Sequence, residues 1–520
     1  MTVTKRIAFG AAASWFSRVV AILLGLLLLP VLFRKLGKEE LGVWLLLGQS
    51  WAVLGVFDLG FTPTLTRRIA QAKGKSGTDP NAPLTEESIR EIADLVASGQ
   101  RIFGCLAAGV LVFSWVAGLL YVRGLELQNL SQTTVMIAWT VLCACQAVNV
   151  ASSVWACLLQ GVGNVGWDAL IVSLISATTL TAQIVAVLCG GGLVSLAVIA
   201  TCGAVGQRGL SRWFARRSRP ELFARQGQWN PTVLRGMPKL AFHAWLYSVG
   251  MLMLFYTDPF FIAAAKGAEG IPAFRAAYVF VHNLTVLAVA VGLASSVFIT
   301  HYWQAGDMAQ VRRLVERNCR LGLLVMLCGC AFVITAGQSL FNLWLGPGNF
   351  TGRTILAVFL IYETLEAHSH IISTCSRATE DEAFGYSTLL AGALKLALAG
   401  ILMQTHGLLG LAVATMVALL LTNHWFMVWR GLQRLQFPFR EYAREVIAPA
   451  LLWAGGAVAL AVVCARVFEP VTDLMKLVAA VIPVGLVFLL ALFRLVMTTQ
   501  ERASVRQKCS ALATSLLPAR

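Results

Sequence analysis

Charged residues are scarce in this sequence, and their scarcity excludes an ordinary soluble globular chain. Only 13% of the 520 residues are Asp, Glu, Lys or Arg, whereas 58% are hydrophobic. Soluble domains are typically about 25% charged and 45–50% apolar. Most apolar runs here are about 18–27 residues long, which is enough for a helix to cross the ~30 Å hydrocarbon core of a bilayer. The sequence therefore predicts an all-α polytopic membrane protein.

Several motifs are also missing. The twelve cysteines include no Cys-x-x-Cys pair and lie mostly inside apolar runs, which indicates packing residues rather than a metal site or a disulfide framework. The Gly-Lys-Ser at 74–76 lacks the earlier glycine of a phosphate loop, because Ile69 occupies that position. With no nucleophile motif and no long loop to house a catalytic domain, we predict no enzyme, no catalytic residue, no metal and no cofactor.

The apolar runs predict about fourteen membrane helices. The first run is too long for a signal peptide, and Arg18 interrupts it, so it is predicted to be the first span. The predicted spans are 7–33, 41–66, 101–122, 133–157, 167–189, 193–210, 240–265, 276–299, 320–337, 353–376, 384–403, 408–429, 446–467 and 474–493.

The net charge of +16 is explained by membrane topology, so it does not indicate nucleic acid as a partner. Lys and Arg gather in alternate loops, most densely in 208–239, whereas the loops between them are nearly bare. Because cytoplasmic loops are enriched in Lys and Arg, both termini are predicted to lie in the cytoplasm. The 208–239 segment is predicted to be either an interfacial helix over anionic lipid or a plain charged linker.

An internal repeat predicts the domain organisation. "GLVSLAV" at 192–198 matches "GLLGLAV" at 407–413, with a separation of 215 residues, and each follows a glycine turn and opens a span. The period is six spans, so both halves have the same membrane orientation. We expect six-helix lobes at 1–207 and 240–429, joined by the 208–239 linker. Two extra spans and a cytoplasmic tail occupy 430–520.

Ionisable residues inside the spans are the candidate functional residues, because they usually face a bundle interior or an aqueous cavity. Arg18 and Asp58 lie at similar predicted depths in neighbouring spans and can pair. Glu366 and Lys395 form a second possible pair in the second half. Each pair either staples two helices together or lines a polar cavity and changes partners during transport.

Other ionisable residues are weaker candidates. Glu363, Glu366 and His370 share one helix face, but no second helix supplies a matching set of metal ligands. Asp258, which precedes Pro259, is either a helix-end carboxylate or a coupling residue. Arg275 is either a snorkelling flank residue or a ligand for an anionic headgroup.

The first seventy residues resemble a known family. "LLPVLFRKLGKEELGVWLLL", with Leu36-Gly37, Glu39 or Glu40 and Gly42, is followed by "VFDLGFTPTLTRRIA", which contains Asp58-Leu59-Gly60. "LLQGVGN" and "LFNLWLGPGNF" add to the likeness. These stretches resemble lipid-linked oligosaccharide flippases, the polysaccharide-transporter branch of the multidrug/oligosaccharidyl-lipid/polysaccharide exporter (MOP) superfamily.

The resemblance implies alternating access in a bacterial inner membrane. The substrate would be a polyprenyl-pyrophosphate-linked oligosaccharide, moved outward for exopolysaccharide, capsule or O-antigen assembly, with membrane lipids, polymerase and glycosyltransferases as partners. It also implies a basic cavity, for which Arg18, Lys395 and Arg275 are the candidates. Asp58, Glu366 and the other intramembrane carboxylates are candidates for coupling and charge pairing.

Two other functions compete with this prediction. A small-molecule exporter of the same superfamily predicts an aromatic-lined, less basic cavity. A polysaccharide polymerase or ligase usually needs a sizeable outer loop with Arg or His residues, and the outer loops here are short.

Overall fold

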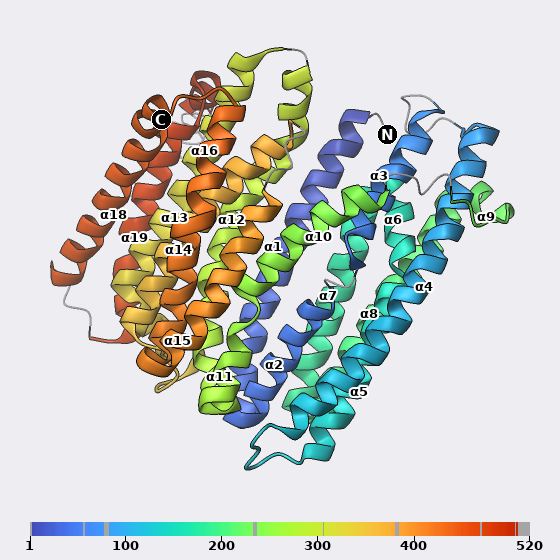
Figure 1. The fold of residues 1–520 in the computed structure, drawn as a ribbon. Helices are drawn as coiled ribbons and strands as arrows, with labels where there is room; N and C mark the ends of the chain where they lie inside the picture. The colour runs from blue at the N-terminus through green and yellow to red at the C-terminus, as the bar shows by residue number, and fades with distance from the viewer. Residues whose placement is uncertain are drawn as a thin grey trace, which may run out of the picture. The chain divides into compact units, whose positions relative to one another are not determined.

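The computed structural model describes residues 3–55, 58–76, 83–231, 237–304, 306–379, 384–467, 471–504 and 506–507. Every regular element in these ranges is a helix (Figure 1). The all-α prediction is therefore confirmed. It follows from the solvent, because a helix satisfies its own backbone hydrogen bonds in a medium without water.

The predicted succession of spans is also found. Within the described residues, eleven helices are long and apolar enough to cross a membrane, and one of them, Gly385–Arg434, covers two predicted spans. The helix α1 (Val3–Lys35) and the pair α2 (Lys38–Gly55) and α3 (Phe61–Gly74) lie at the first two predicted spans.

The chain forms two compact units, of which the first comprises 1–277 and 382–418. These units reflect packing, whereas the predicted lobes rest on the sequence repeat. Within the first unit, α1 packs along α7, α4 along α5 and α10 along α15. Its further helices are α4 (Glu86–Arg123), α5 (Gln132–Ala151), α6 (Ser153–Gly161), α7 (Val165–Leu188), α8 (Leu193–Ser218), α9 (Glu221–Ala224), α10 (Met237–Phe255), α11 (Asp258–Lys266) and α15 (Gly385–Ala418).

The second unit comprises 278–381 and 419–520, and α12 (Ile271–Gln304) enters it from the first. The helix α13 packs against α14 and against both C-terminal helices, α18 and α19. The helices of this unit are α13 (Met308–Leu345), α14 (Arg353–Arg377), α16 (His424–Arg434), α17 (Phe439–Tyr442), α18 (Ala448–Val467) and α19 (Asp473–Ala491). Short π-helical segments at Ala443–Ile447 and Leu492–Val496 flank α18 and α19.

Local sequence explains where several helices begin and end. Side-chain oxygens of Thr85, Asp307 and Thr472 accept backbone N–H groups in the first turns of α4, α13 and α19. The predicted glycine turns are also present, since α8 opens directly after Gly192 and α15 is interrupted at Gly407. Gly407 has φ 59° and ψ −139°, a conformation that glycine adopts without steric penalty.

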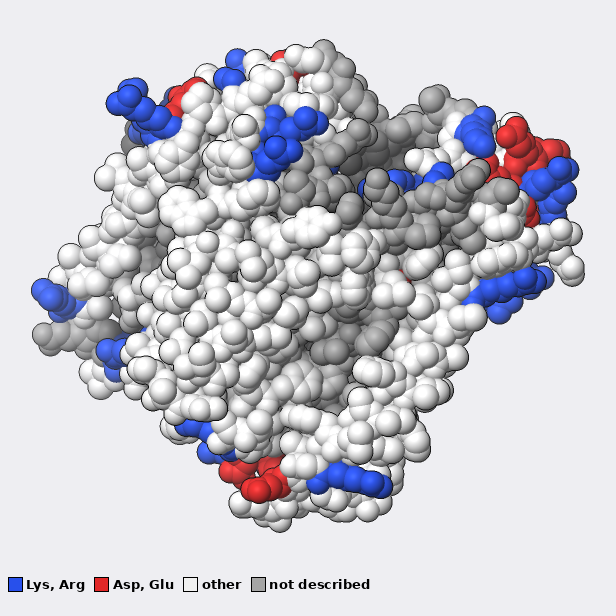
Figure 2. Space-filling model, in the orientation of Figure 1, with Lys and Arg blue, Asp and Glu red and all other residues white. Residues whose placement is uncertain are grey.

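The surface of the first unit matches a lipid environment. Along α4, large apolar side chains point outward, including Phe113 at 59% exposed and Leu120 at 66%. Figure 2 shows the lower part of this flank as uncharged, with charged residues at its lower end and along its upper part. An apolar band bounded by charge is the pattern expected of a helix that spans a bilayer.

Candidate functional site

The predicted seventh span is broken near its end. The helix α10 stops at Phe255, and α11 starts at Asp258 with Pro259 in its first turn. Proline lacks an N–H and fixes φ near −65°, so it favours a new helix start here. The break presents the Thr257 hydroxyl and the Asp258 carboxylate to the neighbouring helix, α15.

Lys395 of α15 reaches this break. Its Nζ lies 2.5 Å from Asp258 Oδ1 and donates to Thr257 Oγ1 at 2.5 Å. The contact with Asp258 is an ion pair without regular hydrogen-bond angles. The Lys395 side chain has no exposed surface, and its ammonium lies 5.4 Å from the centre of the Phe261 ring. A fully buried lysine paired in this way is held in one geometry.

This pairing corrects the prediction that Lys395 pairs with Glu366. Both residues have a similar predicted depth, but depth does not fix the direction in which a side chain points around its helix. Glycines bring α10 and α15 close together, since a Cβ on Gly250 would lie 2.5 Å from the Thr388 backbone. Asp258 is therefore the carboxylate within reach of Lys395.

Asp58 lies in a turn between α2 and α3. Its Oδ1 accepts the Thr62 N–H at 3.0 Å, and Leu59 and Gly60 have φ of 53° and 73°. The carboxylate thus satisfies a backbone donor at the start of α3, where such donors lack helical partners. The predicted pair with Arg18 is not tested, because the Arg18 side chain lies outside the described residues.

A polar cluster near Asp58 was missed in the sequence. Arg208 on α8 donates from Nε to Asn149 Oδ1 at 2.8 Å and interacts electrostatically with Asp58 and Asp168. Asp168 is 7% exposed and accepts from Gln160 at 2.7 Å. Arg208 was assigned to the basic linker, but α8 continues to Ser218. The absence of a helix breaker after 210 was the available signal.

In the second unit, Glu363 is fully buried and makes three side-chain contacts. His282 Nδ1 lies 3.2 Å from its Oε2, and Thr285 Oγ1 donates to the same oxygen at 2.5 Å. The third contact joins the same His282 nitrogen to the other carboxylate oxygen, at 3.3 Å. His282 also stacks on Tyr278, with ring centres 5.3 Å apart. Because His282 is partly exposed and Glu363 is not, the histidine connects the buried carboxylate with the surface of the unit.

Glu366, one helical turn further along α14, is 3% exposed, and neither carboxylate oxygen has a hydrogen-bond partner within the described chain. His370 contacts Thr374 at 3.3 Å. The Nε2 atom of His368, on the same helix, lies 2.7 Å from the hydroxyl of Tyr442. A buried carboxylate without donors is costly in an apolar medium.

Arg275 lies near the start of α12 and is half-buried. Among the described residues, no group of three or more His, Cys, Asp or Glu side chains is arranged to hold a metal ion.

The glutamates of the "LGKEELG" stretch accept hydrogen bonds from loop backbone groups of the first unit. Glu39 accepts the N–H groups of Gln128 and Asn129, both at 2.6 Å. Glu40 accepts the Leu193 N–H at 2.7 Å and so caps the start of α8. Gly42 abuts the backbone at residue 268, where a Cβ would clash at 1.9 Å. The residues that carry the family resemblance therefore have a structural role here.

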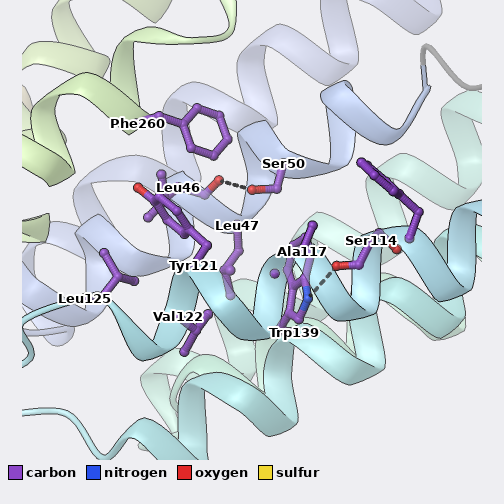
Figure 3. Close-up of a pocket in the computed structure, with 12 residues that line it drawn as sticks. Leu46, Leu47, Ser50, Ser114, Ala117, Tyr121, Val122, Leu125, Trp139 and Phe260 are labelled. Atoms are coloured by element: carbon purple, nitrogen blue, oxygen red, sulfur yellow. Dashed lines mark hydrogen bonds between the residues drawn. The ribbon is translucent and has the colours of Figure 1, made fainter.

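The first unit also contains a cavity of about 280 Å³ among α2, α4, α5 and α11 (Figure 3). Its walls are mainly aromatic and aliphatic, with Phe113, Tyr121, Trp139 and Phe260 as the largest residues, and none of the residues that line it is charged. The Trp139 indole donates to the Ser114 carbonyl at 3.2 Å, and the Tyr121 and Phe260 rings meet edge to face at 5.7 Å. The arrangement suits an apolar ligand.

Comparisons with known proteins show the fold. No protein-family model matches the sequence, and no curated protein matches it. The structure is similar to the lipid II flippase MurJ in an inward closed conformation, with a TM-score of 0.66 and 14% identity over 93% of this chain and 97% of that one. It is also similar to an inward-facing multidrug resistance MATE family transporter of the MOP superfamily, with a TM-score of 0.64 and 14% identity over 84% of this chain and 96% of that one. A MOP superfamily transporter from Pyrococcus furiosus matches with a TM-score of 0.60 and 14% identity over 84% of this chain and 98% of that one.

Proposed function

This chain has the fold of the MOP superfamily transporters, and from that premise we propose that it is a flippase for a polyprenyl-pyrophosphate-linked oligosaccharide. The substrate moves from the cytoplasmic to the periplasmic leaflet of a bacterial inner membrane for cell-surface polysaccharide assembly. The proposal joins the fold with the "LGKEELG" and Asp58-Leu59-Gly60 stretches.

The observation that carries the proposal is the buried cation at the helix break. Broken membrane helices expose backbone and side-chain groups to substrate near the middle of many transporters. Lys395 is neutralised there by Asp258, and an arriving pyrophosphate can replace that carboxylate as its partner. Arg18 and Arg275 are the further cations that we assign to the pyrophosphate.

Coupling is proposed to involve the carboxylates of the second unit. Glu363 is compensated by His282 and Thr285, whereas Glu366 has no donor in the described chain. A carboxylate in that position is stabilised by binding a proton or a cation. Asp58, His370 and Asp258 are assigned to the same set of charge-pairing residues.

Transport is proposed to follow alternating access by two six-helix lobes, 1–207 and 240–429. Both termini lie in the cytoplasm, and 208–239 joins the lobes there. The remaining residues, 430–520, supply the two extra helices. Glycosyltransferases that build the lipid-linked sugar and a polymerase that consumes it are the expected partners.

Flipping in vesicles tests the proposal. Purified protein in proteoliposomes should move a fluorescent polyprenyl-pyrophosphate oligosaccharide between leaflets, as measured by loss of the signal to an added quencher. A Glu366→Gln variant should fold with equal or higher thermal stability and transport at least tenfold more slowly. No flipping above protein-free vesicles, in either gradient direction, would exclude the flippase function.

The second candidate function is a small-molecule exporter, which the cavity of the first unit favours. Its aromatic and uncharged lining matches the expectation for such an exporter. Efflux of an apolar dye by vesicles that do not flip the lipid-linked sugar would select this function. Filling the cavity with Ala117→Trp should then abolish efflux.

A further inference from the structure

Arg208 is an arginine in a helix predicted to cross the membrane, and no carboxylate of the described residues forms a salt bridge with it. It lies in α8, within the candidate span Leu193–Ser218. Within the described residues, its guanidinium makes no salt bridge, although Asp58 and Asp168 interact with it electrostatically. Intramembrane arginines are costly, so an unpaired one indicates a functional site by default.

The two nearby carboxylates each accept a hydrogen bond from another residue, and the second oxygen of Asp168, Oδ1, is buried without a hydrogen-bond partner in the described chain. Asp58 accepts the Thr62 N–H at the start of α3, and Asp168 accepts the Gln160 amide. They lower the free energy of the half-buried positive charge through the surrounding medium without occupying its donors. The charge of Arg208 is thus tolerated, while the hydrogen-bonding capacity of its two terminal nitrogens remains available.

The orientation of the guanidinium is fixed at one nitrogen. Asn149 Oδ1 accepts from Nε at 2.8 Å, which leaves both terminal nitrogens without a hydrogen-bond partner in the described chain. These nitrogens are not sealed from solvent, since Arg208 is only half-buried. A planar guanidinium whose Nε is held and whose two terminal nitrogens are free can bind a phosphate in a bidentate manner.

The position along α8 suits a lipid phosphate. Trp213, 58% exposed, lies five residues further on, and exposed tryptophans mark membrane interfaces. Arg208 is therefore about 7.5 Å deeper than the level of Trp213. That depth is within reach of a phosphate that enters from the headgroup region.

We propose that Arg208, held by Asn149, forms a phosphate-binding subsite of the first unit that contacts the phosphate of a membrane lipid. The claim that this subsite binds the pyrophosphate of the transported lipid rests on the proposed function. The claim that it binds a phosphate does not. The same chemistry fits an anionic phospholipid headgroup, and the experiment separates these two sources.

Binding to the full-length protein in nanodiscs of zwitterionic lipid tests the subsite. The probes are farnesyl pyrophosphate and, as the control without phosphate, farnesol. We expect Arg208→Gln to weaken binding of the pyrophosphate at least tenfold and to leave farnesol binding unchanged. Arg208→Lys should give an intermediate loss because it keeps the charge but not the fork. The matched control is Arg212→Gln, one turn further along α8 and exposed, which should bind as the wild type does.

Asn149→Leu keeps the proposal testable if Arg208→Gln does not fold, and it should weaken the pyrophosphate three- to tenfold. Equal affinity of wild type, Arg208→Gln and Asn149→Leu would overturn the subsite. Phosphatidylglycerol that competes at equal concentration would identify a general phosphate site, and failure to compete would identify a pyrophosphate site. Arg208-dependent binding without any flipping would keep the subsite and remove the flippase function.

Discussion

At the scale of single residues, the ion pair of Lys395 and Asp258 combines a high desolvation penalty with close contact. Both side chains are removed from solvent, and the lysine has no exposed surface. Breaking a buried pair typically costs 3–5 kcal/mol, because the remaining charge is uncompensated, whereas replacing both charges is often neutral. The structural and the transport roles of this pair can therefore be separated.

We predict that Lys395→Met and Asp258→Asn each lower the free energy of unfolding by about 3–5 kcal/mol. The double variant should recover most of that loss. Thermal unfolding of the purified proteins measures both effects. If Lys395 contacts the pyrophosphate, the double variant folds but does not flip the substrate. Normal flipping by the double variant would show that the pair only stabilises the fold and does not contact the substrate.

Sequence reasoning reached these residues unevenly. It selected Lys395 and Asp258, but paired the lysine with Glu366, because helical depth carries no information on azimuth. Asp58 was recognised as unusual, and its bond to the Thr62 N–H became visible only with the turn at Leu59 and Gly60.

At the scale of helices, Arg320 anchors the two C-terminal spans. Its Nε donates to the Glu445 carbonyl at 2.8 Å, and its Nη1 donates to the Leu495 carbonyl at 3.3 Å. Both carbonyls belong to π-helical segments, which interrupt the regular hydrogen-bond pattern. Glu316, one turn before Arg320, supplies the counter-charge at 2.5 Å. One side chain of α13 thus holds the ends of both added helices.

We expect Arg320→Met to lower the free energy of unfolding by about 2–4 kcal/mol, since hydrogen bonds from charged groups contribute roughly 1.5–3 kcal/mol each. Hydrogen exchange should increase first at Ala443–Ile447 and Leu492–Val496. The control is Arg317→Met, whose pair with Glu501 is more than 40% exposed on both sides and should contribute about 0–1 kcal/mol. Equal effects of the two substitutions would contradict the anchor.

At the scale of the whole molecule, charge and aromatic residues determine the predicted orientation. Their positive charge predicts that the arginine-rich 208–239 segment and the tail are cytoplasmic. Exposed tryptophans support an interface near that side, because Trp425 and Trp429 on α16 are 64% and 59% exposed. The loop that contains Gln128 and Asn129 lies on the opposite side in this assignment.

Reporter fusions test the orientation. A fluorescent protein fused after Arg225 should be fluorescent, since that position is predicted to be cytoplasmic. Alkaline phosphatase fused after Asn129 should be active, because it folds only in the periplasm. The reverse pattern would show that the positive charges do not set the topology of this chain.

The sequence by itself determined the helical class, the order of the spans and the glycine turns. In an apolar run of membrane length, the backbone can satisfy its hydrogen bonds locally only as a helix, and glycines mark the turns where such helices end. These features depend on neighbouring residues, so they are readable without distant contacts. The cations and carboxylates inside the spans were readable for the same reason.

The tertiary structure decided which of those charges meet. Asp258 reaches Lys395 because α10 ends early and glycines let α15 approach, and Arg208 meets Asn149 because α8 runs past its apolar stretch. Each partner lies more than fifty residues away in the chain, and its direction depends on helix rotation and packing. Hydropathy and residue spacing contain no information on helix rotation or packing, so the partners could be found only in the folded protein.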